Sequence, residues 1–253
     1  HLILKLKKEK IFNFIKKKID INIIRKNYNL IFNCDNSNLI TKKFFFKRIK
    51  KNYLSYAYTS IVKHSKIQND KAVQIFTKKG PLAFLPISEI ETSVVYSVKG
   101  VNNINLEDSI KKYNSKYKIK NISHPSKFKL KASNLRNYYH SNILAFGDLL
   151  HKVHPLAGQG FNMILRDIKE ILDLVKLKKE CGLVLDSSIC IDFEKNSRNK
   201  NYLFSSGIDL IYEFFNLENK FDNKLLSKSI KLFGKNKNIN RIFTKIADNG
   251  LVL

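Results

Sequence analysis

The sequence of 253 residues contains no tryptophan, one methionine, four prolines and nine glycines. This scarcity of glycine and proline excludes collagen-like and low-complexity chains, which are rich in both residue types. No uninterrupted apolar run approaches the ~20 residues that a membrane-spanning helix requires. With 43% hydrophobic and 27% charged residues, the composition is that of a globular protein with a sizeable core.

Cysteine is scarce as well. Cys34, Cys181 and Cys190 are widely spaced and include no Cys-x-x-Cys pair. This pattern argues against a disulfide scaffold and a structural zinc site, and is typical of a reducing compartment. Cys34 is expected to be a buried strand residue. Because the chain begins at His1, with neither an initiator methionine nor a signal peptide, we expect it to be a fragment.

Acidic residues are few, with 21 against 47 lysines and arginines, and the net charge is +26. Such a charge suggests a nucleic-acid partner. Only six of the 47 basic residues are arginine, however, and arginine is the residue best suited to bidentate contacts with bases and phosphates. Lysine, isoleucine and asparagine, which AT-rich codons encode, are abundant, and asparagine alone occurs 28 times. A solvated basic surface that reflects an AT-rich composition is therefore favoured over a nucleic-acid function.

The first part of the chain is rich in strand patterns. Asn29–Cys34 is predicted to be a buried strand that ends at the turn-forming residues 35–38, and Ile21–Ile24 is a further candidate. Four more predicted strands follow, at Tyr53–Val62, Ala72–Thr77, Pro81–Ile87 and Thr92–Val98. Short loops join the last three, which predicts neighbouring antiparallel strands of one sheet. A helix is expected over Asn105–Tyr117.

The second part of the chain turns from strand to helix. Asn142–Phe146 is a predicted strand, and an irregular loop is expected over His151–Gly158. The next helix carries apolar residues at helical spacing on one face, namely Ile164, Ile168, Ile171, Leu172 and Val175. From about Ile189 the chain is predicted to be helical, with core candidates Phe193, Leu203, Leu210, Phe214 and Phe215. This order indicates a mixed α/β (α+β) fold typical of an enzyme.

The segment from Phe146 to Asn162 carries the chemistry. An acidic residue, Asp148, follows a strand, and glycines lie where a loop enters a helix. Glycine lets a ligand approach the backbone, and the first amides of a helix have no partner within it. Such a site stabilises an anion or a ring that becomes negative on reduction. An aspartate at the end of a strand accepts hydrogen bonds from ligand hydroxyls. These features predict a cofactor loop, although an ordinary strand–loop–helix connection explains a lone pair of glycines equally well.

This segment resembles the second FAD motif of flavin-dependent aromatic hydroxylases, and most of all their ubiquinone-biosynthesis branch. The matching residues are Gly147-Asp148-x-x-His151-x-x-His154-Pro155-Leu156-Ala157-Gly158-Gln159-Gly160-Phe161-Asn162-x-x-x-Arg166-Asp167. Residues 30–38 resemble the strand and turn that the family places against FAD and the nicotinamide cofactor, and residues 80–86 resemble a strand of its substrate-domain sheet. The Gly-x-Gly-x-x-Gly turn that holds the ADP part of FAD in the family occurs nowhere in this sequence. The resemblance therefore implies that the N-terminal dinucleotide-binding part is missing.

The resemblance implies a division of the chain and a set of site residues. Residues 1–51 and 131–180 would belong to the FAD-binding domain, residues 52–130 to a β-rich substrate domain, and residues 181–253 to a C-terminal helical region. The implied cofactor-binding residues are Asp35, Gly147, Asp148, Pro155, Ala157, Gly158, Gln159, Gly160, Phe161 and Asn162. His154 and Pro155 would lie near the flavin ring. Arg166 is expected to tie the loop to the helix through Asp148 or a carbonyl group.

The implied activity is hydroxylation of the aromatic ring of a polyprenylated phenol in ubiquinone biosynthesis. NAD(P)H would reduce FAD, and dioxygen would react through a flavin hydroperoxide, so that the cofactor carries the reaction. Tyr58, Phe84, Leu85 and Tyr96 are candidates for the wall of the substrate pocket, with core packing as the equally favoured alternative. His151 and His154 lack a third ligand nearby, so no metal site is predicted.

A lipophilic substrate lies in the bilayer, which suggests a cytoplasmic protein in peripheral contact with the inner face of the membrane, beside other ubiquinone-pathway proteins. Three alternatives stay open. One is a flavin monooxygenase or reductase that acts on another substrate. The second is a basic nucleic-acid-binding protein, whose binding would depend steeply on salt. The third is an inactive fragment that binds no flavin.

Overall fold

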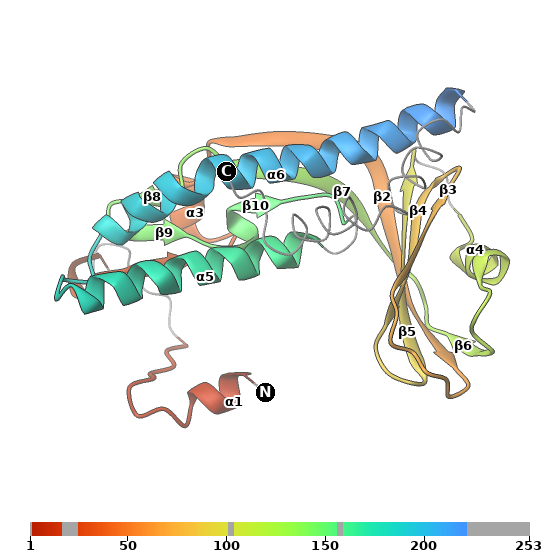
Figure 1. Ribbon diagram of the computed structural model, residues 1–253, viewed down its shortest axis with the longest axis horizontal. Helices are drawn as coiled ribbons and strands as arrows, with labels where there is room; N and C mark the ends of the chain where they lie inside the picture. The colour runs from red at the N-terminus through yellow and green to blue at the C-terminus, as the bar shows by residue number, and fades with distance from the viewer. Residues whose placement is uncertain (1, 17–24, 101–103, 156–158, 222–253) are drawn as a thin grey trace, which may run out of the picture.

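The computed structural model describes residues 2–16, 25–100, 104–155 and 159–221 (Figure 1). Its strands are β1 (Ile31–Asn33), β2 (Arg48–His64), β3 (Val73–Thr77), β4 (Gly80–Pro86), β5 (Glu91–Lys99), β6 (Ile119–Ile122), β7 (Ser126–Leu135), β8 (Tyr139–His140), β9 (Ile143–Ala145) and β10 (His151–Lys152). Its helices are α1 (Leu2–Leu6), α3 (Leu39–Phe44), α4 (Leu106–Tyr113), the 3-10 helix η1 (Gly147–Leu149), α5 (Gln159–Glu180) and α6 (Ser188–Phe221). The predicted mixed α/β fold is confirmed. The strand proposed at Ile21–Ile24 lies outside the described residues.

The larger sheet has the strand order β10-β7-β2-β5-β4-β3, and β6 also pairs with β2. Its pairs are antiparallel throughout, which confirms the predicted adjacency of the three strands that short loops connect. β2 pairs with β7 over much of its length, with a register shift between Asn52 and Tyr56, where Leu54 has a φ of 51°. β2 and β7 each cross a predicted domain boundary, and the division of the chain stays a prediction.

Helix α4 covers one face of the larger sheet at the right of Figure 1. Leu106 and Ile110 of α4 pack with aromatic and aliphatic residues of β2, β4 and β5 in one buried cluster. The side chain of Asn105 accepts hydrogen bonds from the first amides of the helix and caps its N-terminus. The predicted end at Tyr117 is wrong. The side chain of Asn114 bonds both the N–H and the C=O of Tyr117, and this local turn competes with the helix.

The smaller sheet has the order β1-β9-β8, and β1 and β9 run parallel. β9 is fully buried and packs in the main core cluster with η1, Phe193 of α6 and Ile171 of α5. β1, in contrast, is an edge strand, and its Phe32 is exposed. The strand predicted at Asn29–Cys34 is present over Ile31–Asn33 and is only partly buried. The prediction of a buried Cys34 is wrong, because this residue follows the strand and is exposed.

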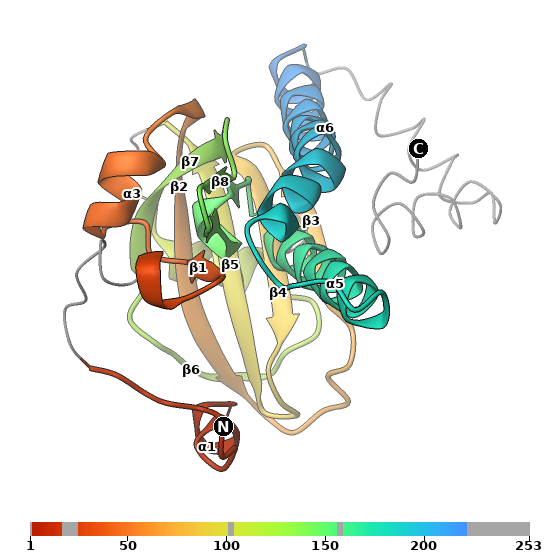
Figure 2. The same ribbon diagram turned by 90° about the vertical axis from the view of Figure 1, so that its left-hand side faces the viewer.

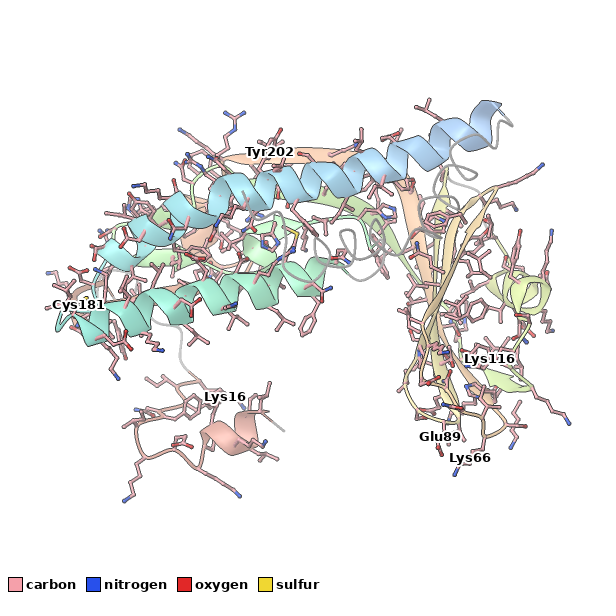
Figure 3. All side chains as sticks on the ribbon, viewed as in Figure 1. Lys16, Lys66, Glu89, Lys116, Cys181 and Tyr202 are labelled. Atoms are coloured by element: carbon pink, nitrogen blue, oxygen red, sulfur yellow. The ribbon has the colours of Figure 1, made fainter. Side chains whose placement is uncertain are left out.

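Helices α5 and α6 lie side by side in both views (Figures 1 and 2). The turn between them carries the exposed Cys181 (Figure 3). The buried face of α5 runs through Met163, Asp167 and Ile171. Two residues of the predicted face, Ile168 and Leu172, are instead 39% and 61% exposed. The face differs because Asp167, a polar residue, is turned inward toward a buried partner.

Helix α6 begins near the smaller sheet and extends to the larger one, which it approaches from the side opposite α4 (Figure 1). Of its predicted core residues, Phe193 is completely buried. The predictions for Leu203 and Leu210 are wrong, since these residues are 44% and 59% exposed. This helix is covered on one side only, so its other apolar side chains remain at the surface. The side chains of Phe214 and Phe215 lie outside the described part of the structure.

Candidate functional site

Two of the predicted cofactor residues follow neighbouring parallel strands. β1 and β9 pair in register from Ile31 with Ile143 to Asn33 with Ala145, and the N–H of Phe146 donates to the carbonyl of Asn33 over 2.9 Å. Asp35 and Asp148 therefore emerge at the same carboxyl edge of the smaller sheet. Both side chains are exposed. Carboxyl edges of parallel strands are where α/β folds bind nucleotides.

The turn after β1 is held rigidly by side chains. The carboxylate of Asp35 accepts hydrogen bonds from the N–H and the hydroxyl of Ser37, each over 2.7 Å, and these bonds lower the pKa of Asp35. The buried Asn33 donates to the hydroxyl of Thr41 and accepts from the side chain of Asn38. Asn38 in turn caps the N-terminus of α3. Asp35 is thus fixed as an anion at the sheet edge.

Arg48 connects this turn to η1, a role that sequence reasoning missed. Its guanidinium donates to the side chain of Asn36 and to the carbonyl of Leu149, both over 3.3 Å, and its Nε donates to the carbonyl of Phe45. The two predicted cofactor segments, more than 100 residues apart in the chain, are joined through this one side chain. The sequence feature that could have indicated this role is the scarcity of arginine, because Arg48 is one of only six arginines among 47 basic residues.

The predicted loop is only partly irregular. His151 and Lys152 form β10, which pairs with Asn134 and Ser133 of β7, because the backbone of this segment completes the edge of the larger sheet. Pro155 is exposed, and α5 begins at Gln159. Gln159, Gly160, Phe161 and Asn162 form its first turn, whose amides have no partner within the helix. Gly147, with a φ of 64°, adopts the left-handed conformation at the start of η1. Ala157 and Gly158 lie outside the described residues.

A buried polar contact anchors the loop to both long helices. Nε2 of His151 lies 2.6 Å from Oδ2 of Asp167 on α5, and the side chains of both residues are almost fully buried. The other carboxylate oxygen of Asp167 accepts a hydrogen bond from Asn201 of α6 over 2.9 Å. Two partners thus satisfy a carboxylate that would otherwise be costly to bury.

His154 lies in an aromatic cluster. Its completely buried ring stacks on Tyr212 of α6, with centroids 4.2 Å apart, and meets the edge of Tyr53 of β2 at 4.9 Å. Tyr53 donates its hydroxyl to Asp209, and the hydroxyls of Tyr212 and Ser55 are 2.8 Å apart. Burial and, to a lesser extent, the charge of Lys51 lower the pKa of His154 to about 4, so the ring is neutral.

Unsatisfied polar atoms concentrate around this loop. Within the described residues, eight buried side-chain nitrogen or oxygen atoms have no hydrogen-bond partner, and six of them belong to His151, His154, Gln159 and Arg166. Buried polar groups without partners are rare in folded proteins and call for a reason, such as a bound ligand. Free donors and acceptors beside the first turn of α5 fit a cofactor with a polar ring edge and phosphate groups, which FAD provides.

Arg166 does not make the predicted contact with Asp148. Its guanidinium carbon lies 4.0 Å from the centroid of the Phe204 ring on α6, and both terminal nitrogens lack a partner among the described residues. The helix directs this side chain toward α6, whereas Asp148 lies at the exposed edge of the smaller sheet.

The predicted wall of the substrate pocket does not form one surface. Tyr58, Phe84 and Tyr96 are buried in the cluster beneath α4, as the core-packing alternative expects. Leu85 is 37% exposed. Successive residues of a strand point to opposite faces of the sheet, so Phe84 and Leu85 cannot line the same wall.

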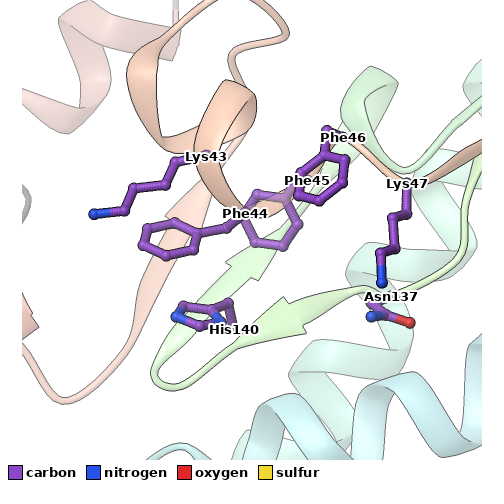
Figure 4. A pocket seen from close by; sticks show the side chains of 7 residues that line it. All are labelled: Lys43, Phe44, Phe45, Phe46, Lys47, Asn137 and His140. Atoms are coloured by element: carbon purple, nitrogen blue, oxygen red, sulfur yellow. The ribbon is translucent and has the colours of Figure 1, made fainter.

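A pocket of about 250 Å³ lies beside α3 and β8, and none of the residues that line it is a predicted cofactor residue (Figure 4). Within it the ring of Phe44 stacks on His140, with centroids 4.0 Å apart. Over the described ranges, no group of three potential metal-ligating side chains occurs, and no helix is long and apolar enough to cross a bilayer.

Comparison with curated proteins finds ubiquinone hydroxylases. The chain is 27% identical over 156 residues to 3-demethoxyubiquinol 3-hydroxylase of Escherichia coli, covering 58% of this chain and 40% of that protein. It is 20% identical to the mitochondrial ubiquinone biosynthesis monooxygenase COQ6 of Schizosaccharomyces pombe, covering 88% and 57%. It is 24% identical to the ubiquinone hydroxylase UbiL of Rhodospirillum rubrum, covering 64% and 41%. These similarities confirm the predicted resemblance, although the chain spans only about half the length of these relatives. No protein-family model matches the chain.

Comparison with solved structures confirms the fold. The anhydrotetracycline hydroxylase OxyS of Streptomyces rimosus matches with a TM-score of 0.60 at 12% identity, over 87% of this chain and 45% of that one. HpxO of Klebsiella pneumoniae, solved with FAD and uric acid, matches with a TM-score of 0.59 at 10% identity, over 87% and 59%. The Diels-Alderase PyrE3 matches with a TM-score of 0.62 at 11% identity, over 87% and 50%. Since one fold serves different reactions, this likeness establishes architecture and leaves the reaction to the site.

Proposed function

We propose that this chain is part of an FAD-dependent monooxygenase that hydroxylates the aromatic ring of a polyprenylated phenol in ubiquinone biosynthesis, with NAD(P)H and dioxygen as co-substrates. The observation that carries the proposal is the junction of two cofactor segments. Asp35 and Asp148 share one sheet edge, and unsatisfied polar atoms gather at the neighbouring loop and helix. The similarity to ubiquinone hydroxylases supports the substrate class.

Both segments would contact FAD. Asp148 would contact the ribityl and pyrophosphate region of FAD and accept hydrogen bonds from the ribityl hydroxyls, and Asp35 would lie near the pyrophosphate or the path of the nicotinamide. The first turn of α5 would direct its free amides at the pyrimidine edge of the flavin ring, where negative charge accumulates on reduction. Pro155 and Ala157 would line the ring. Bound FAD would supply the oxygen chemistry, and the protein would orient it and exclude water.

The substrate is assigned to the face of the larger sheet opposite α4. Leu85 pairs with Ser93, and Ala83 pairs with Val95. Val95 also pairs with Thr59, so these residues share that face. The same face continues to Ala57, which clusters with Tyr53 and Tyr212 beside His154. The small side chains on this face, among them Ala57, Ala83 and Ser93, leave space for an aromatic ring, which larger residues would occupy.

The basic surface gives the proposed substrate a route to the protein. A polyprenylated phenol lies in the bilayer, and lysines near an anionic leaflet each contribute about 1 kcal/mol to peripheral binding. We therefore place the protein at the cytoplasmic face of a membrane, in contact with other proteins of the pathway. Cosedimentation with vesicles that contain anionic lipid tests this placement, and equal recovery with neutral vesicles contradicts it.

Titration of the purified chain with FAD, followed by quenching of flavin fluorescence, tests the cofactor site. We expect saturable binding that Asp148→Ala weakens by about tenfold to a hundredfold, since a hydrogen bond to a charged group contributes roughly 1.5 to 3 kcal/mol. Asp173→Ala is the matched control, because it removes an exposed carboxylate from α5 outside the site. The absence of saturable binding by the wild-type chain contradicts the cofactor assignment.

Product analysis then separates the proposal from its alternatives. With NADH or NADPH and a prenylated phenol, the hydroxylase yields a hydroxylated ring, whereas a reductase or a different flavoenzyme yields hydrogen peroxide alone. A nucleic-acid-binding protein would instead bind DNA or RNA with a steep salt dependence that survives Asp148→Ala. Either of these outcomes replaces the proposed function.

A further inference from the structure

We propose that Arg166 anchors an anion-binding site between α5 and α6 that takes a carboxylate or a phosphate group of a small ligand. Nothing in the resemblance or in the similar proteins' names assigns such a role to this residue. Its guanidinium faces α6, whereas Asp35 and Asp148 follow the paired strands β1 and β9 of the smaller sheet. The evidence for this site is the contact that holds the guanidinium and the absence of hydrogen-bond partners for its terminal nitrogens.

The guanidinium is held by its face. Its central carbon lies 4.0 Å from the centroid of the Phe204 ring, a cation–π contact that fixes the side chain against α6. An arginine stacked in this way uses its face for the ring and keeps its edge for hydrogen bonds. That edge presents paired N–H donors in a planar fork, which matches the two oxygens of a carboxylate or phosphate.

The edge of Arg166 is buried and unpartnered. Both terminal nitrogens are inaccessible to solvent and lack a hydrogen-bond partner among the described residues. An uncompensated buried charge is strongly unfavourable, so such groups are normally paired. Burial lowers the pKa of Arg166, and the adjacent Asp167 offsets this effect in part.

No described acidic side chain bonds the terminal nitrogens of Arg166. Asp167 already bonds His151 and Asn201 through its two oxygens. On α6, Glu194 pairs with Arg198, while Asp209 contacts Tyr53 and Lys51. An anion supplied from outside the described chain therefore completes the site.

The surroundings narrow the chemistry of the ligand. Gln159 lies seven residues before Arg166, two turns along the same face of α5, and its buried Oε1 is also unpartnered. A ligand that bonds both residues must present an acidic oxyanion to the guanidinium and a donor, such as a hydroxyl or an N–H, toward Gln159. Arginine prefers a planar or tetrahedral oxyanion to a halide, since only the former engages both nitrogens.

Thermal unfolding of the chain in the presence of inorganic pyrophosphate and of benzoate, at matched ionic strength with chloride as reference, tests the site without any flavin. We expect a saturable rise of Tm with at least one of these anions. Arg166→Gln should abolish this rise, and Arg166→Lys should weaken the affinity about tenfold because lysine cannot form the bidentate contact. Arg198→Gln is the matched control, since this exposed arginine already has a partner in Glu194.

Two further titrations identify the source of the anion. If the anion is a phosphate of FAD, Arg166→Gln weakens FAD and leaves riboflavin, which has no phosphate, unchanged. If the anion is the carboxylate of another ligand, both flavins bind Arg166→Gln as they bind the wild type, and benzoate binding alone is lost. A saturable anion effect without FAD binding would sustain the site and remove the proposed cofactor.

The proposal is overturned if none of these anions raises Tm saturably. It is also overturned if Arg166→Gln responds to these anions as the wild type and the control Arg198→Gln do. Should circular dichroism show that Arg166→Gln does not fold, the comparison of Arg166→Lys with the wild type decides the question. If the lysine variant then retains the full affinity for pyrophosphate or benzoate, the bidentate site is rejected.

Discussion

Nε2 of His151 lies 2.6 Å from Oδ2 of Asp167 in the interior of the protein. This contact joins β10 to α5, and Asn201 extends it to α6. It also decides which side of α5 is buried, because Asp167 must face the histidine. The loop that leads into α5 is thereby anchored immediately before its proposed cofactor-binding residues.

The first prediction concerns this pair. Asp167→Ala leaves the buried side chains of His151 and Asn201 without their partner and should lower the free energy of unfolding by about 1 to 3 kcal/mol. His151→Ala should also destabilise the protein, and the double variant should lose less than the sum of the single losses, with a coupling above about 1 kcal/mol. Urea unfolding of the four proteins measures the cycle. Additive losses would show that the two side chains do not stabilise each other.

The second prediction concerns His154 and pH. The folded protein holds the pKa of this residue at about 4, whereas an unfolded chain has a histidine pKa of about 6.5. Between these values the unfolded state binds a proton that the folded state does not. The contribution of His154 to stability is therefore fully present above about pH 6.5. As the pH falls below this value, the free energy of unfolding decreases by about 1.4 kcal/mol per pH unit, to a total loss of about 3 kcal/mol.

Urea unfolding at pH 7 and pH 5 measures this dependence. His154→Phe keeps an aromatic ring between Tyr53 and Tyr212 and should flatten the slope over this range. His124→Gln is the control, since His124 is exposed and its loss should leave the slope unchanged. A wild-type slope that persists in His154→Phe assigns the pH dependence to other groups.

The third prediction tests the orientation of α5 with neighbouring residues. Ile171 is 8% exposed and packs in the main core, while Leu172 is 61% exposed. Ile171→Ala should cost about 2 to 4 kcal/mol through lost packing and the cavity it leaves. Leu172→Ala should cost less than about 0.5 kcal/mol, as is usual for surface positions. Urea unfolding compares the two, and the reverse ranking would mean that the helix is turned by one residue.

The fourth prediction concerns Gly80 at the turn between β3 and β4. It has a φ of 137°, and a Cβ added there would lie 2.1 Å from the carbonyl oxygen of Ser97. A backbone atom cannot move aside as a flexible side chain does, so Gly80→Ala should destabilise the protein by more than about 2 kcal/mol. Gly182, with a φ of 67°, would place its Cβ in open space.

Gly182→Ala is therefore the control, with an expected cost of about 1 kcal/mol from its left-handed backbone alone. The shift in the urea midpoint measures both variants. Equal losses in the two would show that the carbonyl of Ser97 does not limit position 80.

Local patterns predicted most elements of this fold. Alternation and turn residues located β2 to β5, because each of these strands is bounded by short polar loops. The density of glycine and polar residues over 143–167 indicated the cofactor segment, which the similarity to ubiquinone hydroxylases supports. Helix periodicity found α5 but placed Ile168 and Leu172 in the core, because hydropathy alone cannot anticipate a buried aspartate.

Contacts between distant residues were beyond such patterns. Arg48 joins Asn36 to Leu149, and no local spacing relates those three positions. Tyr58 and Leu85 were assigned to one pocket wall because both are large side chains in strands. Which face each one occupies depends on strand pairing, which places Tyr58 under α4 and Leu85 on the other side.

By itself, the sequence determined where most strands and turns lie and where a cofactor loop is predicted, since backbone preferences and glycine positions act over a few residues. Only the tertiary structure decided which side chains meet. It brought Asp35 and Asp148 to one sheet edge through parallel pairing, enclosed His154 between Tyr53 and Tyr212, and turned Asp167 inward and Arg166 onto Phe204. Burial strengthens polar interactions and penalises unpaired charge, and burial is a property of the packed molecule alone.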